Sequence, residues 1–260
     1  MEGEGPRVSD EILTERHGRV LVITINRPDA RNAVNLAVSQ GLADAVDELD
    51  EDADLSVAVI TGAGGNFCAG MDLKAFAAGE VVAIPGRGIG FTERPPRKPL
   101  LSAVEGYALA GGTEVVLATD LVVASRTAKF GIPEVKRGLV AAGGGLLRLQ
   151  KRIPYQKALE LALTGESFTA AQGEAWGFVN VVTEPGKALD GAIELAERIT
   201  ANGPLAVATT KEIMVKSADW SEDEMWKKQL EHIIPIFTSN DAKEGAIAFA
   251  EKRAPNWTGT

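Results

Sequence analysis

The sequence predicts a mixed α/β core followed by a helical C-terminal third. Residues 20–25 (VLVITI) form a short β-branched apolar run, which is typical of a strand covered on both faces. Between Asn35 and Leu49 the apolar positions follow helical spacing, and residues 55–60 repeat the strand pattern. A strand, a helix and a strand with short connections predict a parallel crossover unit. After about residue 143 the pattern becomes mostly helical.

The remaining elements have less regular patterns. Residues 62–70 are glycine-rich, and residues 79–98 carry enough proline and glycine to predict a mobile loop. The other strands are predicted at 100–104, 121–124 and 178–182. The other helices are predicted at 71–76, 111–118, 154–163, 169–176, 187–201, 204–217 and 222–252.

The composition excludes several classes of protein. The chain carries 27 Lys and Arg against 36 Asp and Glu, a net charge of −9, which argues against non-specific binding of nucleic acid or anionic membranes. The single cysteine, Cys68, excludes an internal disulfide and a cysteine-rich zinc site. No stretch reaches the ~20 apolar residues of a membrane helix, and residues 1–16 lack the apolar centre of a signal peptide. We therefore expect a cytoplasmic globular protein without a metal site.

Glycine makes up 28 of the 260 residues, so nucleotide-binding loops have to be tested. The stretches that begin at Gly62 and Gly86 both have phenylalanine where a dinucleotide-binding fingerprint needs its third glycine. The sequence also contains no P-loop and no G-x-S-x-G elbow. These glycines therefore predict close approach of the backbone and not the binding of a cofactor diphosphate.

The most informative segment is residues 100–125, LLSAVEGYALAGGTEVVLATDLVVAS. Glu114 stands there between Gly111-Gly112 and a wholly apolar helical stretch. Burial would remove much of the hydration of its carboxylate, raise its pKa and suit it to proton transfer near neutral pH. The alternative is a structural carboxylate that stabilises the helix dipole from the first turn. The residue taken alone favours the structural interpretation, because structural carboxylates also show perturbed pKa values.

Glu134 is a second acidic candidate, and it follows a proline in AKFGIPEVKRG. Taken alone, this pattern favours an ordinary surface glutamate paired with Lys136 or Arg137. Such a pair is worth under about 1 kcal/mol.

Two backbone turns carry a further signal. Gly111 opens a helix after a strand, so its N–H points outward as an unpaired donor. Gly70 and Met71 stand at a similar strand-to-helix junction in NFCAGMDL. If the turns converge, their amides form an oxyanion hole, usually worth a few kcal/mol per donor. The alternative is the ordinary use of glycine in tight turns.

Six collinear motifs between residues 25 and 257 resemble a known family. They are INRPDARNAVN (25–35), GNFCAGMDL (65–73), LSAVEGYALAGGTEVVLATDL (101–121), KFGIPEVKRG (129–138), TAAQGEAWGFVNVV (169–182) and EGAIAFAEKRAPNW (244–257). Together they resemble the crotonase superfamily, also called the enoyl-CoA hydratase/isomerase family. The resemblance covers nearly the whole chain, from about residue 20.

The resemblance implies a fold and a reaction. The fold would be the crotonase-like α/β spiral of ββα units. Residues 1–200 would be the CoA-thioester-binding core, and residues 201–260 would be a helical region that packs across subunits in a homotrimer or hexamer. The reaction would be syn addition of water to the double bond of a 2-enoyl-CoA thioester, in fatty acid or related acyl-CoA metabolism. No metal or redox cofactor is implied, because the CoA is part of the substrate.

The resemblance also implies a set of site residues. The amides of Met71 and Gly111 would bind the thioester carbonyl oxygen. Glu114 would act chiefly on the water and Glu134 on the proton at the α carbon, as a pair whose titrations are coupled. Substrate and CoA would contact Arg27, Ala30, Arg31, Ala33, Ala69, Gly70, Asp72, Leu73, Tyr107, Ala142 and Lys252.

Some of these residues carry more specific expectations. Arg27, Arg31 and Lys252 are candidate partners for the CoA phosphates, with a solvated surface charge as the alternative for each. Asp72 is expected to be a structural cap more than a catalyst, and Tyr107 a wall of the pocket. Cys68 is expected to be a small buried residue, because no base stands beside it in the motif.

The chain departs from the family pattern in several places. Many hydratases have a proline-glycine pair after the second glutamate, where this chain has Ala141-Ala142, although an amide near Ala142 is still expected to hold the water. Asp29 stands where a lysine is common, and Ile233 where an aromatic residue often packs on the CoA. Residues 79–98, which typically shape the acyl pocket, match no known pattern. The acyl group is therefore left open.

Other functions on the same fold stay open as alternatives. One is isomerisation of an enoyl-CoA, or dehydration of a hydroxyacyl-CoA such as a carnitinyl thioester. Another is an RNA-binding relative, which the −9 charge and the absence of any basic cluster longer than Lys151-Arg152 or Lys227-Lys228 disfavour. A third is a weakly catalytic subunit of a larger complex, which the missing proline-glycine pair would favour.

Overall fold

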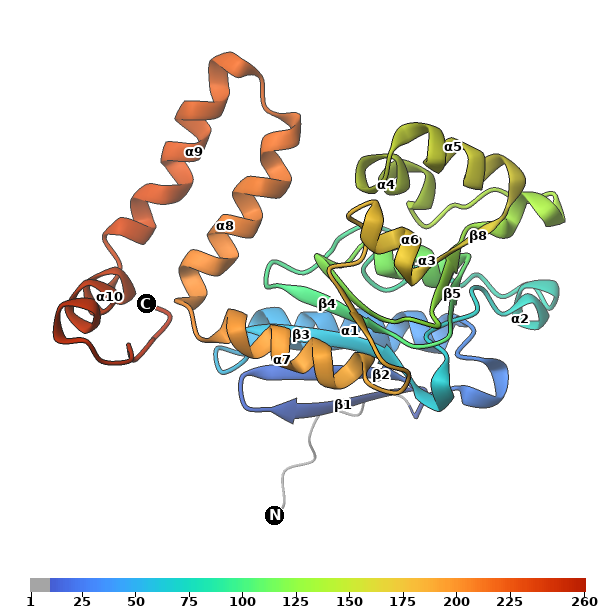
Figure 1. Ribbon diagram of the computed structural model, residues 1–260, viewed down its shortest axis with the longest axis horizontal. Helices are drawn as coiled ribbons and strands as arrows, with labels where there is room; N and C mark the ends of the chain where they lie inside the picture. The colour runs from blue at the N-terminus through green and yellow to red at the C-terminus, as the bar shows by residue number, and fades with distance from the viewer. Residues whose placement is uncertain (1–9) are drawn as a thin grey trace.

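Two β-sheets form the centre of the computed structural model, which describes residues 10–260 (Figure 1). Residues 1–9, part of the segment expected to lack a signal peptide, lie outside the described residues. The larger sheet has the strand order β1-β2-β3-β4-β6-β9, and all its neighbouring strands are parallel except β1 and β2. Its strands are β1 (Ile12–His17), β2 (Val20–Ile25), β3 (Val57–Gly62), β4 (Leu100–Val104), β6 (Leu121–Ser125) and β9 (Val181–Thr183).

The smaller sheet consists of three short strands, β5 (Tyr107–Leu109), β7 (Lys129–Gly131) and β8 (Ser167–Thr169), in the order β5-β7-β8. The chain twice passes from the larger sheet to the smaller one, from β4 to β5 and from β6 to β7. An isolated bridge between Cys68 and Ala108 brings the turn that follows β3 to the same edge. This repeated step is the spiral implied by the resemblance. The parallel pairing predicted for residues 20–25 and 55–60 is confirmed as β2 with β3.

Helices cover both faces of the larger sheet, because alternate residues of its central strands are apolar on opposite sides. Leu21 and Ile23 pack in one core with helix α1, whereas Val20 and Val57 pack in another against Ala192 of helix α7. The helices are α1 (Leu36–Glu51), α2 (Leu73–Ala77), α3 (Gly111–Leu117), α4 (Gly145–Arg152), α5 (Tyr155–Thr164), α6 (Ala170–Ala175), α7 (Ala188–Thr200), α8 (Pro204–Lys216), α9 (Glu222–Phe237) and α10 (Asn240–Glu251).

Some sequence predictions need correction. The long helix predicted at 222–252 is two helices, because the chain turns at Thr238 and Ser239, where the Ser239 side chain accepts a hydrogen bond from the Ala242 amide and caps α10. Helix α4 and strands β1, β5, β7 and β8 are absent from the predictions, because short or glycine-flanked elements carry little periodicity. Residues 79–98 contain no helix or strand, as predicted. Their second half is nonetheless packed, since Ile89 and Phe91 are buried.

The C-terminal helices extend away from the sheets (Figure 1). Helices α8 and α9 contain no buried residue. Lys211 of α8 nevertheless donates a hydrogen bond to Asp120 Oδ2 at 2.6 Å, and this bond connects the helix to the core. The division predicted at residue 200 falls between the end of α7 and the start of α8. Within residues 10–260, no helix combines the length and apolar character needed to cross a membrane.

Candidate active site

A mostly apolar pocket of about 390 Å³ opens among α2, α3 and the 3-10 helix Pro133–Arg137. It brings together four residues predicted from the sequence to be central: Met71, Gly111, Glu114 and Glu134. Its other lining residues are Ala69, Leu73, Phe76, Val82, Ala83, Gly88, Ile89, Glu93, Leu109, Ala110, Pro133, Arg137, Leu139, Val140, Ala142 and Gly143.

Helix α3 places Glu114 deep in this pocket. All residues of the helix are buried, and Glu114 itself is only 3% exposed. Its Oε1 accepts a hydrogen bond from the Gly145 amide at 2.9 Å. Burial raises the pKa of Glu114 above its usual 4.5, while the amides of Gly143 and Gly145 and the charge of Arg148 oppose that rise. A carboxyl group in these surroundings is suited to exchange a proton closer to neutral pH than a free glutamate.

The glycine turn, residues 143–145, allows the Glu114 carboxylate to lie against the backbone. A Cβ atom added to Gly143 would lie 2.8 Å from Oε2 of Glu114, and one added to Gly145 would lie 3.0 Å from Oε1. Both distances are too short for an ordinary contact, so larger residues would displace the carboxylate. Ala142, where a water-holding amide was expected, lines the pocket. The backbone groups that reach Glu114 belong to the two glycines.

Glu134 faces the same pocket from the 3-10 helix. Its Oε2 is buried and has no hydrogen-bond partner among residues 10–260. Burial raises the pKa of Glu134, the nearby charge of Glu114 raises it further, and Arg137 lowers it. No side-chain hydrogen bond to Lys136 or Arg137 acts on Glu134 in the described part of the chain. The surface-glutamate interpretation therefore does not match the position of this side chain.

The two predicted amides converge on one wall of the pocket. A Cβ atom added to Gly70 would lie 3.4 Å from the Gly111 nitrogen, and one added to Gly111 would lie 3.7 Å from the Met71 nitrogen. Neither Met71 nor Gly111 donates its N–H to another backbone group of residues 10–260. Gly111 begins α3, so it has no acceptor within the helix. Two neighbouring free N–H groups can stabilise an oxygen that gains negative charge.

Ala110 precedes Gly111 and sets the direction of its amide, a role that the sequence analysis missed. Its φ of 51° and ψ of −124° are unusual for a residue with a side chain, and such strain costs about 1–3 kcal/mol. The Ala110 N–H donates to the Gly131 carbonyl at 2.8 Å, which ties this turn to β7. Nothing in an alanine signals a positive φ, so only the surrounding structure identifies this residue.

Arg27 and Asp72 hold each other instead of pointing freely to a ligand. Arg27 Nη2 lies 3.0 Å from Asp72 Oδ2, and Arg27 Nε lies 3.1 Å from Glu11 Oε1. Asp72 Oδ1 also accepts hydrogen bonds from two amides of α2, so Asp72 caps that helix as predicted. These bonds hold the pKa of Asp72 below its usual value. The phosphate contact predicted for Arg27 stays a prediction, and it would compete with these ion pairs.

The other predicted CoA contacts fall in two places. Arg31, Ala69 and Tyr107 line a hollow of about 330 Å³, which shares Ala69 and Leu109 with the main pocket. Lys252 follows α10, on the far side of the molecule from α2 (Figure 1). Within one chain it is therefore separated from the pocket.

Four predicted substrate or CoA contacts remain, together with the separate expectation for Cys68. Ala30 ends a 3-10 helix, and the Ala33 carbonyl accepts a hydrogen bond from Arg27 Nη1 at 2.5 Å. Gly70 is buried with φ +98°, and the half-exposed Leu73 lines the main pocket. As predicted, Cys68 is buried, and burial raises the pKa of its thiol to about 12.

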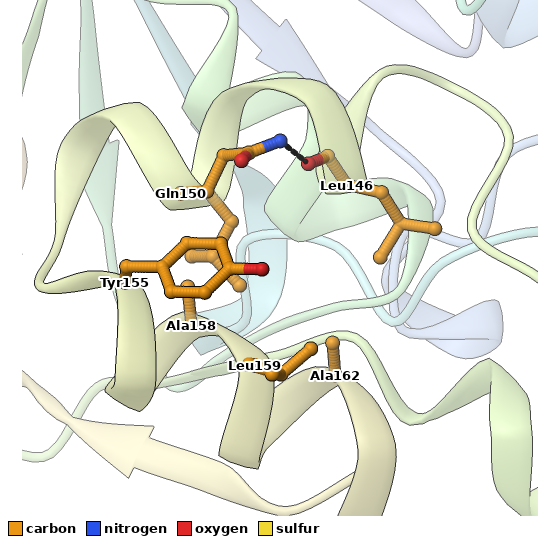
Figure 2. Close-up of a pocket in the computed structure, with 7 residues that line it drawn as sticks. Leu146, Gln150, Tyr155, Ala158, Leu159 and Ala162 are labelled. Atoms are coloured by element: carbon orange, nitrogen blue, oxygen red, sulfur yellow. Dashed lines mark hydrogen bonds between the residues drawn. The ribbon is translucent and has the colours of Figure 1, made fainter.

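A further, smaller hollow of about 170 Å³ lies between α4 and α5 (Figure 2). Gln150 donates its side-chain amide to the Leu146 carbonyl at 3.1 Å, so its polar group is already bonded within α4. The walls are otherwise mainly leucine and alanine with Tyr155, and they include no carboxylate or cation. This hollow therefore lacks the pair of carboxyl groups that the main pocket contains.

The sheet arrangement and the C-terminal helices are those of the crotonase fold. Residues 15–260 match the enoyl-CoA hydratase/isomerase family, and the chain belongs to that family.

Relatives with known names cover nearly the whole chain. An enoyl-CoA hydratase of Mycobacterium tuberculosis is 44% identical over 95% of this chain and 96% of its own length. A carnitinyl-CoA dehydratase of Salmonella arizonae is 41% identical over 97% of this chain and 100% of its own. The crystal structure of an enoyl-CoA hydratase from Mycobacterium tuberculosis H37Rv has a TM-score of 0.96 and 67% identity, over 97% of this chain and 100% of that one.

Proposed function

We propose that this protein is an enoyl-CoA hydratase, a hydro-lyase that adds water to the double bond of a 2-enoyl-CoA thioester. One observation carries the proposal: two carboxyl groups, Glu114 and Glu134, share an apolar pocket with two free amides. The family and the named relatives support it. The mainly apolar walls suit an acyl chain, and the amides suit the thioester carbonyl.

In the proposed reaction, the Glu114 carboxylate takes a proton from water while the water oxygen bonds to the β carbon. The π electrons of the double bond move toward the carbonyl, whose oxygen becomes an enolate stabilised by the amides of Met71 and Gly111. Glu134, in its acid form, then protonates the α carbon and the thioester carbonyl re-forms. Burial and the mutual charge of the two glutamates favour one proton on the pair, because two ionised carboxylates repel each other.

A second reaction, dehydration of a 3-hydroxyacyl-CoA such as carnitinyl-CoA, uses the same groups in reverse. The 41% identity to a carnitinyl-CoA dehydratase supports this alternative. Two charged residues, Glu93 and Arg137, also line the pocket. A substrate with a polar or charged acyl group would find partners there that a plain acyl chain does not need.

The CoA portion is proposed to lie along the hollow beside Arg31, Ala69 and Tyr107. Because Lys252 is distant from this hollow in its own chain, a contact between Lys252 and CoA would need a neighbouring subunit. Homotrimers or hexamers built through α8, α9 and α10 would supply one. The proposed chemistry needs no metal or redox cofactor.

The test follows the loss of enoyl-thioester absorbance with crotonyl-CoA, for the wild type and for Glu114→Gln and Glu134→Gln. Each variant should lower kcat by about two decades or more, because each loses one proton-transfer group. Glu166→Gln serves as the matched control, since Glu166 is exposed and does not line the pocket. Activity that survives Glu114→Gln but not Glu134→Gln would indicate a one-base isomerisation instead. Wild-type turnover of carnitinyl-CoA but not crotonyl-CoA would select the dehydratase.

A further inference from the structure

Arg148 is a half-buried cation beside the pocket that the proposed reaction does not use. It lies on α4, three residues after the glycine turn. Its Nη2 donates a hydrogen bond to the Thr92 carbonyl at 2.5 Å, so it joins α4 to the loop at 79–98. Burial lowers the pKa of Arg148, and the charge of Glu114 raises it. A partly buried guanidinium is costly unless hydrogen bonds or an opposite charge compensate it, so Arg148 is expected to interact with specific groups.

The part of the loop that Arg148 holds is a tight buried turn. Thr92 is fully buried, and its Oγ1 accepts a hydrogen bond from the Ile89 amide at 2.9 Å. The Ile89 side chain fills the space beside the backbone of Gly111 and Gly143. A Cβ atom added to Gly111 would lie 3.0 Å from Ile89 Cδ1, and one added to Gly143 would lie 3.2 Å away. This turn therefore closes the pocket between the amide of Gly111 and the glycine turn.

The glycine turn lies against both charged groups, the Glu114 carboxylate and the Arg148 guanidinium. Gly143 and Gly145 lie against the Glu114 carboxylate, and Gly144, with φ +101°, lies against the Arg148 guanidinium. A Cβ atom at Gly144 would collide with Nη1 of Arg148. Few charged groups act on Glu114 or its neighbours: Arg148 attracts the Glu114 charge, Glu114 and Glu134 repel each other, Arg137 acts on Glu134, and Arg152 acts on Arg148.

We infer that Arg148 is a positioning residue, which holds the Ile89–Thr92 turn over the pocket and places its charge against the same glycine turn that holds the Glu114 carboxylate. Its guanidinium does not line the pocket, so it acts through Glu114 and Thr92 and not on the substrate. The inference rests on the proposed hydration, in which the ionised form of Glu114 activates water. It gives a function to the three consecutive glycines that follow Ala141-Ala142, the position where the family's usual proline-glycine pair is missing.

The consequence for pH dependence has a definite sign. Burial raises the pKa of Glu114, and the charge of Arg148 limits that rise. Without the charge, Glu114 holds its proton to a higher pH. The acid limb of the kcat/KM profile, where Glu114 becomes the active base, should then move upward.

The test measures kcat/KM against pH for the wild type and for Arg148→Met, Arg148→Gln and Arg148→Lys. Arg148→Met should move the acid limb to higher pH by about 0.5 to 1 pH unit. At a pH below the limb, kcat/KM should then be roughly three- to tenfold lower than in the wild type. Arg148→Gln keeps an amide donor toward Thr92 without the charge, so it should move the limb equally with less effect on KM. Arg148→Lys keeps the charge and should leave the limb at the wild-type position.

Arg152→Met is the matched control. Arg152 stands on the same helix and also donates to a backbone carbonyl, that of Thr119 at 2.8 Å, but it does not act on Glu114. The acid limb of the kcat/KM profile of Arg152→Met should coincide with that of the wild type. A limb that stays in place in folded Arg148→Met and Arg148→Gln would overturn the inference, as would an equal shift in Arg152→Met. Circular dichroism establishes that each variant is folded.

A readout that is independent of turnover separates this inference from the proposed function. The carboxyl group of Glu114 is titrated by ¹³C NMR of labelled glutamate and assigned by its loss in Glu114→Gln. A higher Glu114 pKa in Arg148→Gln than in the wild type supports the inference even if no thioester is hydrated. An unchanged pKa overturns it even if hydration is established.

Discussion

Helices α3 and α9 show how differently two regions of this molecule are stabilised. Every residue of α3 is buried, including the charged Glu114. No residue of α9 is buried, although it is more than twice as long. Its apolar side chains, among them Trp226, Leu230, Ile234 and Phe237, follow the spacing of one helical face and remain exposed. Phe237 is 76% exposed.

The two helices differ in what covers their apolar side chains. Helix α3 lies between the small sheet and α4, so its own chain supplies all its neighbours. The apolar face of α9 has no such cover within residues 10–260. An uncovered apolar stripe of this kind marks a surface for association. It is the face that the proposed trimer or hexamer would bury.

The largest expected effect compares one substitution in the two regions. Leu117, at the end of α3, is 1% exposed, and Leu230, in α9, is 51% exposed. Leu117→Ala should lower the free energy of unfolding by about 2–5 kcal/mol, because it leaves a cavity. Leu230→Ala should cost the single chain less than about 1 kcal/mol, yet it should weaken assembly. Urea denaturation measures the first effect and light scattering the second.

Similar losses of stability for Leu117→Ala and Leu230→Ala would break the comparison, since they would place α9 inside the chain's own core. An unchanged assembly in Leu230→Ala and in Phe237→Ala together would remove α9 from the proposed interface.

An intermediate effect concerns the junction between the two regions. Lys211 of α8 donates to Asp120 Oδ2 at 2.6 Å and to the Lys98 carbonyl at 2.9 Å. Lys211→Met should lower the free energy of unfolding by about 1–3 kcal/mol, because it leaves both partly buried acceptors without this donor. Lys216→Met is the control on the same helix. Its exposed ion pair with Glu212 should contribute under about 1 kcal/mol. Equal effects in thermal denaturation would mean that α8 is not anchored through Lys211.

The smallest expected effect is a change in the pH dependence of stability. Glu114 and Glu134 have raised pKa values in the folded protein, so the folded state binds their protons more tightly than the unfolded state. Stability should therefore fall as pH rises from about 4.5 through the raised values. Glu114→Gln removes one buried charge and its repulsion of Glu134, so the pKa of Glu134 should fall. The Tm of this variant should then depend less steeply on pH, and a steeper dependence would contradict the assignment.

Much of the core could be predicted from local pattern. The apolar runs that became β2, β3, β4 and β6 are buried on both faces, and such runs read as strands whatever surrounds them. Helix α1 showed its buried face through spacing alone. Strands β5, β7 and β8 have three residues each, too few for a period to appear. Their pairing depends on neighbours that are distant in the sequence.

The candidate site also combines features that the local sequence predicts with features that depend on distant segments. The sequence by itself determined the chemical groups: two carboxyl residues, and glycines at two strand-to-helix turns. The tertiary structure decided where they meet. The nearness of Met71 to Gly111, the positive φ of Ala110 and the seat of Glu114 on residues 143–145 all depend on packing between segments far apart in the chain. Local sequence fixes which atoms are available, but long-range packing sets their burial and distances, and therefore their pKa values and their chemistry.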